Sequence, residues 1–238
     1  MIKNLKKFNS IILVILLFAT FSLSNFNVQA KQRVIVIDPG CQAIENNDKE
    51  SIGPGTWKWV SEDMVGAKGV TTGTNEYDMN LSVALKVKEL LGDEYKVELT
   101  RSTNDVNMSN SDRAMIANTL KADLYISIHA SGPEDDSSGV KVICQTKDNP
   151  YSMTNYRNSR LLADTLLGSI TEKAAPKKYE VAESDKLLGI NWCTVPNAVV
   201  IIGNLKNQED DEKLADSEYL LKIAEGIVSG IDSYYSQK

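Results

Sequence analysis

Short apolar runs and stretches of helical periodicity alternate along residues 33–238. The runs are typical of buried strands and lie at 33–37, 95–100, 123–128, 139–145 and 198–202. Apolar residues at helical spacing, with end signals at some boundaries, predict helices over 76–91, 109–120, 156–173 and 217–235. This order of strands and helices predicts a single α/β domain with a mostly parallel mixed sheet that is flanked by helices.

Residues 41–75 interrupt this alternation, because they show no clear periodicity and are rich in glycine, threonine and charged residues. We expect a long loop, and loops of this length in compact domains are often functional. Trp57 and Trp59 lie in it. They either stack on a sugar or peptide ligand or hold the loop against the body of the domain.

The first 30 residues have the pattern of a secretory signal peptide. Lys3, Lys6 and Lys7 precede an apolar stretch at 11–21, and small residues suited to cleavage follow at 28–30. We therefore expect a signal peptide at 1–30, a single domain at 31–238, and a secreted protein with no membrane association after cleavage. The alternative is an uncleaved membrane anchor, but the apolar stretch is shorter than the ~20 residues of a spanning helix.

The net charge limits which partners are expected, and the cysteine count limits how many disulfides can form. Residues 31–238 contain 23 basic and 32 acidic side chains, a formal net charge of −9. This acidic balance argues against nucleic acid as a partner. The chain has three cysteines, so at most one disulfide forms within it. Cys144 and Cys193 either pair or remain buried thiols.

Three potential metal ligands fall at the ends of predicted elements. Cys41 follows the first strand, Glu76 begins the first helix, and His129, the only histidine, ends the central strand. Ligands of open α/β sheets sit beyond the carboxyl ends of the strands, and a thiolate, a carboxylate and an imidazole are suitable zinc ligands. Each has a simpler interpretation, as a small buried hydrophobe, a helix-terminal charge and a hydrogen-bonded core residue respectively.

Several stretches carry a family resemblance, in order along the chain. They are Val-Ile-Val-Ile-Asp-Pro-Gly at 34–40, Asn-Glu-Tyr-Asp-Met-Asn-Leu at 75–81, Leu-Thr-Arg at 99–101, Ser-Asp-Arg at 111–113, Ser-Ile-His-Ala at 127–130, the strand at 139–142, and 196–207. Together they resemble the zinc-dependent N-acetylmuramoyl-L-alanine amidases, which implies an amidase-like domain at 31–238. The resemblance implies that Cys41, Glu76 and His129 hold zinc, and that the substrate is peptidoglycan, cleaved between N-acetylmuramic acid and L-alanine.

Three positions depart from the pattern of that family. Cys41 stands where it has its first histidine ligand, Ile201 where it has the catalytic glutamate, and Asn204 where it has an aromatic residue. The thiolate makes the net charge of the zinc site 0 instead of +1, which lowers the acidity of bound water. Because Ile201 accepts no proton, we assign no catalytic residue, and loss of a general base typically costs ~10²–10⁴ in rate.

Two other functions therefore stay open. The protein is either a degenerate amidase that binds peptidoglycan or a protein partner without cleaving it, or a zinc hydrolase with an altered substrate and a relocated base. The candidates for such a base are Glu209, Asp210 and Asp211. Arg101 and Arg113 are expected to organise the fold through Asp105 and Asp112.

Overall fold

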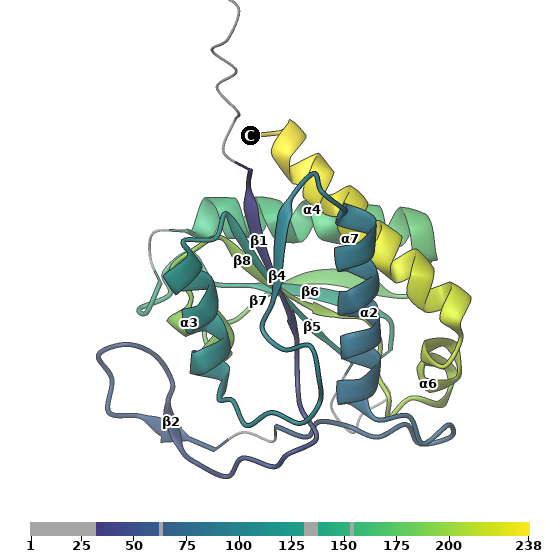
Figure 1. Cartoon of the computed structure of the whole chain (residues 1–238), viewed down its shortest axis with the longest axis horizontal. Coiled ribbons are helices and arrows are strands. Elements are labelled where there is room, and N and C mark those ends of the chain that lie inside the picture. Colours follow the sequence, from purple (N-terminus) through teal and green to yellow (C-terminus); the bar gives the residue numbers. More distant parts are fainter. Residues whose placement is uncertain (1–31, 62–63, 131–137, 153–154) are drawn as a thin grey trace, which may run out of the picture. The chain divides into compact units, whose positions relative to one another are not determined.

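A six-stranded sheet forms the centre of the computed structural model, in the order β4–β1–β5–β8–β6–β7 (Figure 1). The strands are β1 (Val34–Pro39), β4 (Lys96–Leu99), β5 (Leu124–His129), β6 (Val140–Cys144), β7 (Tyr179–Glu183) and β8 (Asn197–Ile201). Four of the five pairings are parallel, and only β6 and β8 run antiparallel. The predicted mostly parallel mixed sheet is confirmed. A separate two-stranded ribbon pairs β2 (Glu50–Ser51) with β3 (Trp59–Val60).

The structure describes residues 32–61, 64–130, 138–152 and 155–238. The predicted signal peptide lies outside these residues and remains a prediction. None of the described helices is both long and apolar enough to cross a membrane.

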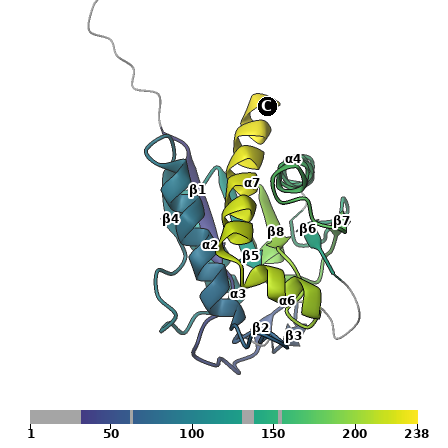
Figure 2. The same ribbon diagram turned by 90° about the vertical axis from the view of Figure 1, so that its right-hand side faces the viewer.

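Helices cover both faces of the sheet (Figures 1 and 2). On one face pack α2 (Glu76–Leu91), α4 (Tyr156–Ala174) and α7 (Ser217–Ser236), and their apolar side chains form the larger core with the sheet. On the other face α3 (Asn110–Leu120) and α5 (Leu188–Trp192) build a smaller core. The short α6 (Gln208–Leu214) follows β8. Because both faces are covered, β1 and β5 are buried almost throughout and read as continuous apolar runs.

The helices predicted from periodicity are present within a residue or two of their expected ends. Ser109 and Asp112 form the capping box of α3, each side chain accepting a hydrogen bond from the backbone of the other. Gly92 ends α2 with a φ of 53°, a conformation that suits glycine.

Four elements were not predicted: the β2–β3 ribbon, β7, α5 and α6. The ribbon strands, α5 and α6 contain two to seven residues each, too few to show a period. β7 is an edge strand whose residues are all exposed or half-buried, so it lacks the apolar run of a central strand.

Cys144 and Cys193 do not form the disulfide that the sequence left open. Both are buried free thiols. Cys144 belongs to the core of α2, α4 and α7, whereas Cys193 belongs to the core of α3. The sheet separates the two cores, so the cysteines serve as small apolar side chains.

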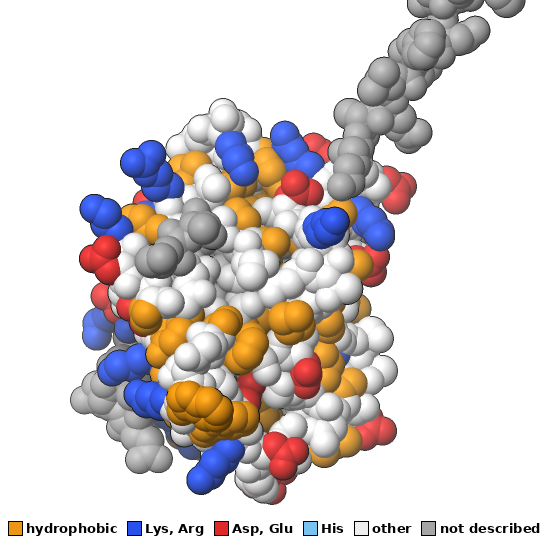
Figure 3. Space-filling view, turned by 90° about the vertical axis from the view of Figure 1, so that its left-hand side faces the viewer, with side chains coloured by type: hydrophobic (Ala, Val, Ile, Leu, Met, Phe, Trp, Pro, Cys, Tyr) orange, Lys and Arg blue, Asp and Glu red, His pale blue; other side chains and the backbone are white. Residues whose placement is uncertain are grey.

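The surface in Figure 3 carries basic and acidic side chains that are interspersed, while exposed hydrophobic side chains gather toward its lower half. This face therefore offers no uniform basic field of the kind that attracts nucleic acid.

Candidate metal centre

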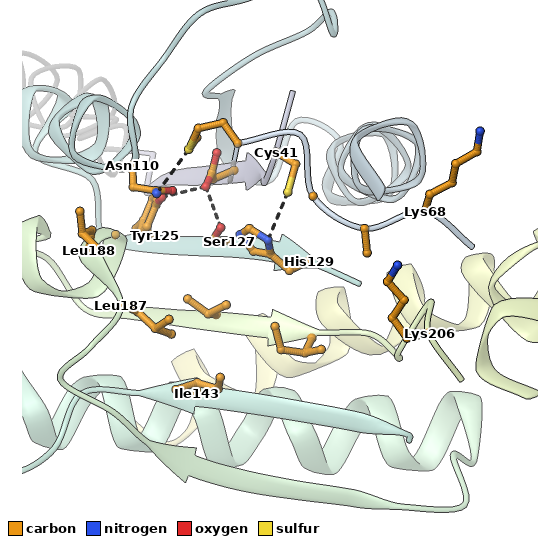
Figure 4. A pocket seen from close by; sticks show the side chains of 17 residues that line it. Cys41, Lys68, Asn110, Tyr125, Ser127, His129, Ile143, Leu187, Leu188 and Lys206 are labelled. Atoms are coloured by element: carbon orange, nitrogen blue, oxygen red, sulfur yellow. Dashed lines mark hydrogen bonds between the residues drawn. The ribbon is translucent and has the colours of Figure 1, made fainter. Parts of the chain in front are cut away.

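The three predicted ligands meet at the carboxyl edge of the sheet. Ligand atoms of Cys41, Glu76 and His129 all lie within 4.8 Å of one another. His129 Nδ1 is 3.8 Å from Cys41 Sγ and 3.2 Å from Glu76 Oε1. Because β1 and β5 are parallel neighbours, the residues after β1 and at the end of β5 fall side by side. Figure 4 shows Cys41 and His129 facing each other above the ends of these strands.

Two glycines make room for the cluster. A Cβ on Gly40 would overlap the imidazole ring of His129. A Cβ on Gly66, whose φ is +77°, would lie 2.6 Å from Cys41 Sγ and 2.7 Å from Glu76 Oε2. Cys41 itself has a φ of 62°, which is unusual for a residue with a side chain. The backbone is therefore bent at several points to bring the three side chains together.

Backbone amides fix the carboxylate of Glu76. Ala67 N donates to Oε2 at 2.8 Å and Ala130 N donates to Oε1 at 3.1 Å. Burial by itself would raise the pKa of Glu76, but the hydrogen bond and charge of His129 and the two amides outweigh burial and lower the pKa to about 2. Glu76 is therefore ionised across the physiological range.

Cys41 is in the opposite state. Burial, followed by the nearby charge of Glu76, raises the pKa of the Cys41 thiol well above its ordinary value. The side chain therefore carries its proton when no cation is bound, and a cation must displace that proton.

The donor set fits zinc. Sulfur, nitrogen and carboxylate oxygen are its usual ligands, and atoms around a tetrahedral zinc lie about 3.3–3.7 Å apart. The separations of His129 Nδ1 from Glu76 Oε1 and Cys41 Sγ, 3.2 and 3.8 Å, are close to that range, and all three ligand atoms lie within 4.8 Å of one another. Three protein ligands leave the fourth position for water or substrate, as in catalytic sites.

A buried ion pair supports the turn that carries Cys41. Arg113 Nη1 lies 3.0 Å from Asp38 Oδ1, and Arg113 Nη2 donates to Cys41 O at 3.1 Å. Thr100, Tyr125 and Ser127 also donate hydroxyl hydrogen bonds to Asp38. Burial would raise the pKa of Asp38, but Arg113 and the hydroxyls lower it to about 2.

The arginines organise the fold as expected, but the predicted partners are wrong. Arg113 pairs with Asp38 and not with Asp112, whose carboxylate caps α3. Arg101 donates to the carbonyls of Pro39, Gly40 and Tyr77, with no bond to Asp105. The partners are distant in sequence, so proximity along the chain was the wrong guide.

The cluster opens into a cavity of about 750 Å³. Leu187, Leu188 and Ile143 line one end of it, and Lys68 and Lys206 lie at the other, beyond His129 (Figure 4). Cys41 and His129 thus lie between these apolar side chains and the two lysines, and the volume of the cavity suits a ligand of small-molecule or short-peptide size.

Ile201 also lines this cavity and is the register partner of His129 on the neighbouring strand β8. The side chain that stands beside the cluster is thus a hydrocarbon.

The three carboxylates considered as a relocated base lie elsewhere, and none lines the cavity. Asp210 accepts bonds from the amides of Gly139 and Asn204. Asp211 accepts bonds from Thr71 and Thr72. Glu209 pairs with Lys177 and Lys213. All three have structural partners, and the structure brings none of these candidate bases to the cavity.

Trp57 and Trp59 do not hold the long loop against the body of the domain. Trp57 is 93% exposed and Trp59 is 55% exposed. The loop is held instead by Glu50, which accepts from the amides of Asn110 and Ser111, and by Ser51 O, which accepts from Trp192 Nε1.

Sequence reasoning missed Asp38, Lys68 and Lys206 at the cavity. Asp38 was noted only within the stretch at 34–40 that carries the family resemblance, although a carboxylate between an apolar strand and a Pro-Gly pair is a signal for a strand-end site. Neither lysine has such a signal, because both are solvent-exposed loop residues.

A family model described as N-acetylmuramoyl-L-alanine amidase matches residues 35–233 of the chain. The chain belongs to the N-acetylmuramoyl-L-alanine amidase family. The resemblance drawn from the ordered motifs is thereby confirmed for nearly the whole domain.

Individual relatives agree with this membership. The chain is 31% identical over 170 residues to the uncharacterized protein YqiI of Bacillus subtilis, covering 71% of this chain and 78% of YqiI. It is 26% identical over 168 residues to the amidase LytC of the same organism, covering 70% of this chain but only 32% of LytC. The catalytic domain of the amidase CwlV from Bacillus (Paenibacillus) polymyxa var. colistinus has the same fold, with a TM-score of 0.68, 26% identity, and coverage of 87% of this chain and 100% of that domain.

Proposed function

We propose that this protein is an extracytoplasmic peptidoglycan amidase that holds zinc through Cys41, Glu76 and His129. The observation that carries the proposal is the convergence of these three donors beside a large cavity, in a chain of the amidase family. Peptidoglycan lies outside the cell membrane, so the proposal includes export by the segment at 1–30. The reaction is hydrolysis of the amide that joins N-acetylmuramic acid to L-alanine.

The chain's own residues prepare this site for an amide substrate. Glu76 is held ionised and in one orientation by the amides of Ala67 and Ala130. The ion pair of Asp38 and Arg113 fixes the turn that presents Cys41. Zinc bound there would supply Lewis acidity, polarising the amide carbonyl and making water more acidic.

The same residues limit the rate. A thiolate in place of a neutral ligand reduces the positive charge available to substrate. Ile201 takes no proton from water, and loss of a general base typically costs ~10²–10⁴ in rate. We therefore expect slow hydrolysis, with bulk solvent or the substrate itself accepting the proton.

The test measures zinc and hydrolysis in parallel. Residues 31–238 are purified with zinc, and zinc per protein is determined by atomic emission for the wild type and for His129→Ala. New amino groups on L-alanine are then counted after incubation with peptidoglycan. Stoichiometric zinc and amino-group release, both lost in a folded His129→Ala protein, support the proposal. Equal release by both proteins contradicts it.

Binding without cleavage is the second candidate, and one observation favours it. The only carboxylates among the described residues that line the cavity or form the cluster are Asp38 and Glu76, and both are occupied by hydrogen-bond partners. No carboxylate of this described lining is thus available as a base. Retention of the wild type on insoluble peptidoglycan, with no amino-group release even when zinc is bound, would select this function.

A further inference from the structure

Two lysines line the same end of the cavity. Lys68 precedes α2 and Lys206 follows β8, and both line the cavity beyond His129, at the end away from Leu187 and Leu188 (Figure 4). Both side chains are solvent-exposed at this mouth.

Hydrogen bonds lock together the loops that carry these lysines. Val70 N donates to Leu205 O at 3.1 Å, which joins the loop of Lys68 to the loop of Lys206. Leu205 N in turn donates to Ala130 O, next to His129. The position of both lysine backbones is therefore fixed relative to the metal cluster.

Asp211 fastens the first of these loops from the other side. Its carboxylate accepts bonds from the amides of Thr71 and Thr72 at 2.7 and 2.9 Å, and from the Thr72 hydroxyl at 2.6 Å. A Cβ on Gly69 would overlap this carboxylate, so the loop approaches α6 as closely as its backbone allows. These bonds hold the loop that carries Lys68 in a fixed position against α6.

Neither ammonium group is neutralised within the described residues. The ion pairs of lysines there involve other lysines, namely Lys86, Lys96, Lys141, Lys177, Lys213 and Lys222. The chain beyond residue 30 has a net charge of −9, which makes two unpaired cations at one cavity mouth stand out from their surroundings. Two cations at one end of a cavity favour an anionic ligand.

We propose that Lys68 and Lys206 bind carboxylate groups of an acidic peptide whose scissile amide lies at the metal cluster. This inference rests on the proposed function and assigns the peptide side of the substrate to the cationic end of the cavity. The sugar side then lies toward Leu187 and Leu188. Carboxylates suit these lysines because each ammonium is a point charge that can pair with a carboxylate oxygen.

The test compares two ligands that differ only in charge. A muramoyl peptide with L-alanine followed by an acidic residue is titrated into the protein calorimetrically, beside the same peptide with its carboxylates amidated. The measurements use the wild type, Lys68→Gln, Lys206→Gln and the double variant. Lys121→Gln is the control, because Lys121 is an exposed lysine that ends α3, ahead of the amino end of β5.

We expect the acidic ligand to bind more tightly than its amide. Each single substitution should weaken binding of the acidic ligand ~3–10-fold, and the double substitution at least ~10-fold, with no effect on the amide. Lys121→Gln should match the wild type. The preference for the acidic ligand should shrink as salt is raised, since exposed charges are screened.

Three outcomes would overturn the inference: equal binding of both ligands or of neither, a preference that survives the double substitution, or equally tight binding of inorganic phosphate at the lysines. Failure of the amidase proposal would give a different result. The wild type would bind no zinc and release no amino groups from peptidoglycan, but would still bind the acidic ligand more tightly than its amide. A protein that hydrolyses peptidoglycan but ignores ligand charge would retain the proposed function and reject the lysine site.

Discussion

Gly66 is the residue on which the shape of the metal cluster depends most directly. Its missing side chain leaves the space between Cys41 Sγ and Glu76 Oε2. Gly66→Ala should reduce zinc affinity at least ~10-fold, because the new methyl group would displace one of the two ligands. Zinc titration against a chelating indicator measures this effect.

Gly55→Ala is the matched control for that substitution. Gly55 has a φ of +74°, almost that of Gly66, but a Cβ there meets nothing within 4 Å. Both variants should lose about 1–2 kcal/mol of stability from backbone strain. Only Gly66→Ala should lose zinc, and a similar loss in both would mean that strain, not the ligand space, controls binding.

Ile201 and Cys41 together limit the chemistry that the site can perform. Replacing Ile201→Glu restores a proton acceptor next to His129, and replacing Cys41→His restores a neutral ligand. We expect the double variant to raise amino-group release from peptidoglycan by ~10²–10⁴, far more than either change alone.

Ile143→Glu provides the control for the added carboxylate. Ile143 lines the same cavity and is half-buried like Ile201, but its register partner on β8 is Val199, two residues away from Ile201. It should give no gain. If the double variant binds zinc and stays inert, the loss of activity extends beyond these two positions.

Two glycines on α7 determine how closely α4 and α7 pack against each other. Gly226 and Gly230 are one helical turn apart on α7, and a Cβ at either would approach the backbone of α4 to 2.6–2.7 Å, at Ile170 and Leu166 respectively. Backbone atoms cannot move aside as a flexible side chain can. The helices are therefore held at a separation that only glycine permits.

Gly226→Ala should destabilise the protein by about 1–3 kcal/mol, the usual cost of overpacking. Gly168→Ala, in α4, is the control because a Cβ there meets nothing within 4 Å, and it should raise stability by about 0.5–1 kcal/mol through helix propensity. Urea unfolding of the two variants and the wild type measures both changes. Equal effects of the two substitutions would rule out the steric explanation.

Element prediction succeeded where an element buries a full face or stripe. The strands at 34–39 and 124–129 appear in the sequence as continuous apolar runs, and the helices α2, α3, α4 and α7 appear as apolar residues at helical spacing. The edge strand β7 and the short α5 and α6 leave none, because their form follows from the neighbours on which they pack. Sequence periodicity records burial, so it is silent where burial is partial.

Asp38 joins distant parts of the whole molecule. It lies in β1, pairs with Arg113 in α3, and accepts hydroxyl bonds from Thr100 after β4 and from two residues of β5. Asp38→Asn would leave the buried Arg113 without its charged partner. We expect a loss of about 3–5 kcal/mol at pH 7.

The effect of Asp38 should depend on pH with a defined sign. Its pKa is about 2 in the folded protein and near the ordinary 3.8 when unfolded, so the unfolded chain binds more protons between these values. Ionisation of Asp38 therefore stabilises the folded protein by about 2 kcal/mol. This contribution is complete above pH ~4 and is lost as the pH falls toward 2. Urea unfolding should show the gap between wild type and Asp38→Asn narrowing by about 1 kcal/mol from pH 7 to pH 3.

Asp105→Asn is the control for this experiment, because Asp105 is exposed and was the wrongly expected partner of Arg101. It should leave stability unchanged at both pH values. A gap between wild type and Asp38→Asn that stays constant from pH 7 to pH 3 would contradict the assigned role of the carboxylate.

The sequence by itself determined the α/β class, the order of the main elements and the family. It also determined the three residues that meet at the strand ends, because parallel strands bring their carboxyl ends to one edge. Tertiary structure alone decided the partner of Arg113, the separation of Cys144 from Cys193, and the removal of Glu209, Asp210 and Asp211 from the cavity. It also placed Lys68 and Lys206 at one end of the cavity. The physical reason is the same in each case: these contacts join residues far apart in sequence or on opposite faces of the sheet, and local patterns carry no record of such pairings.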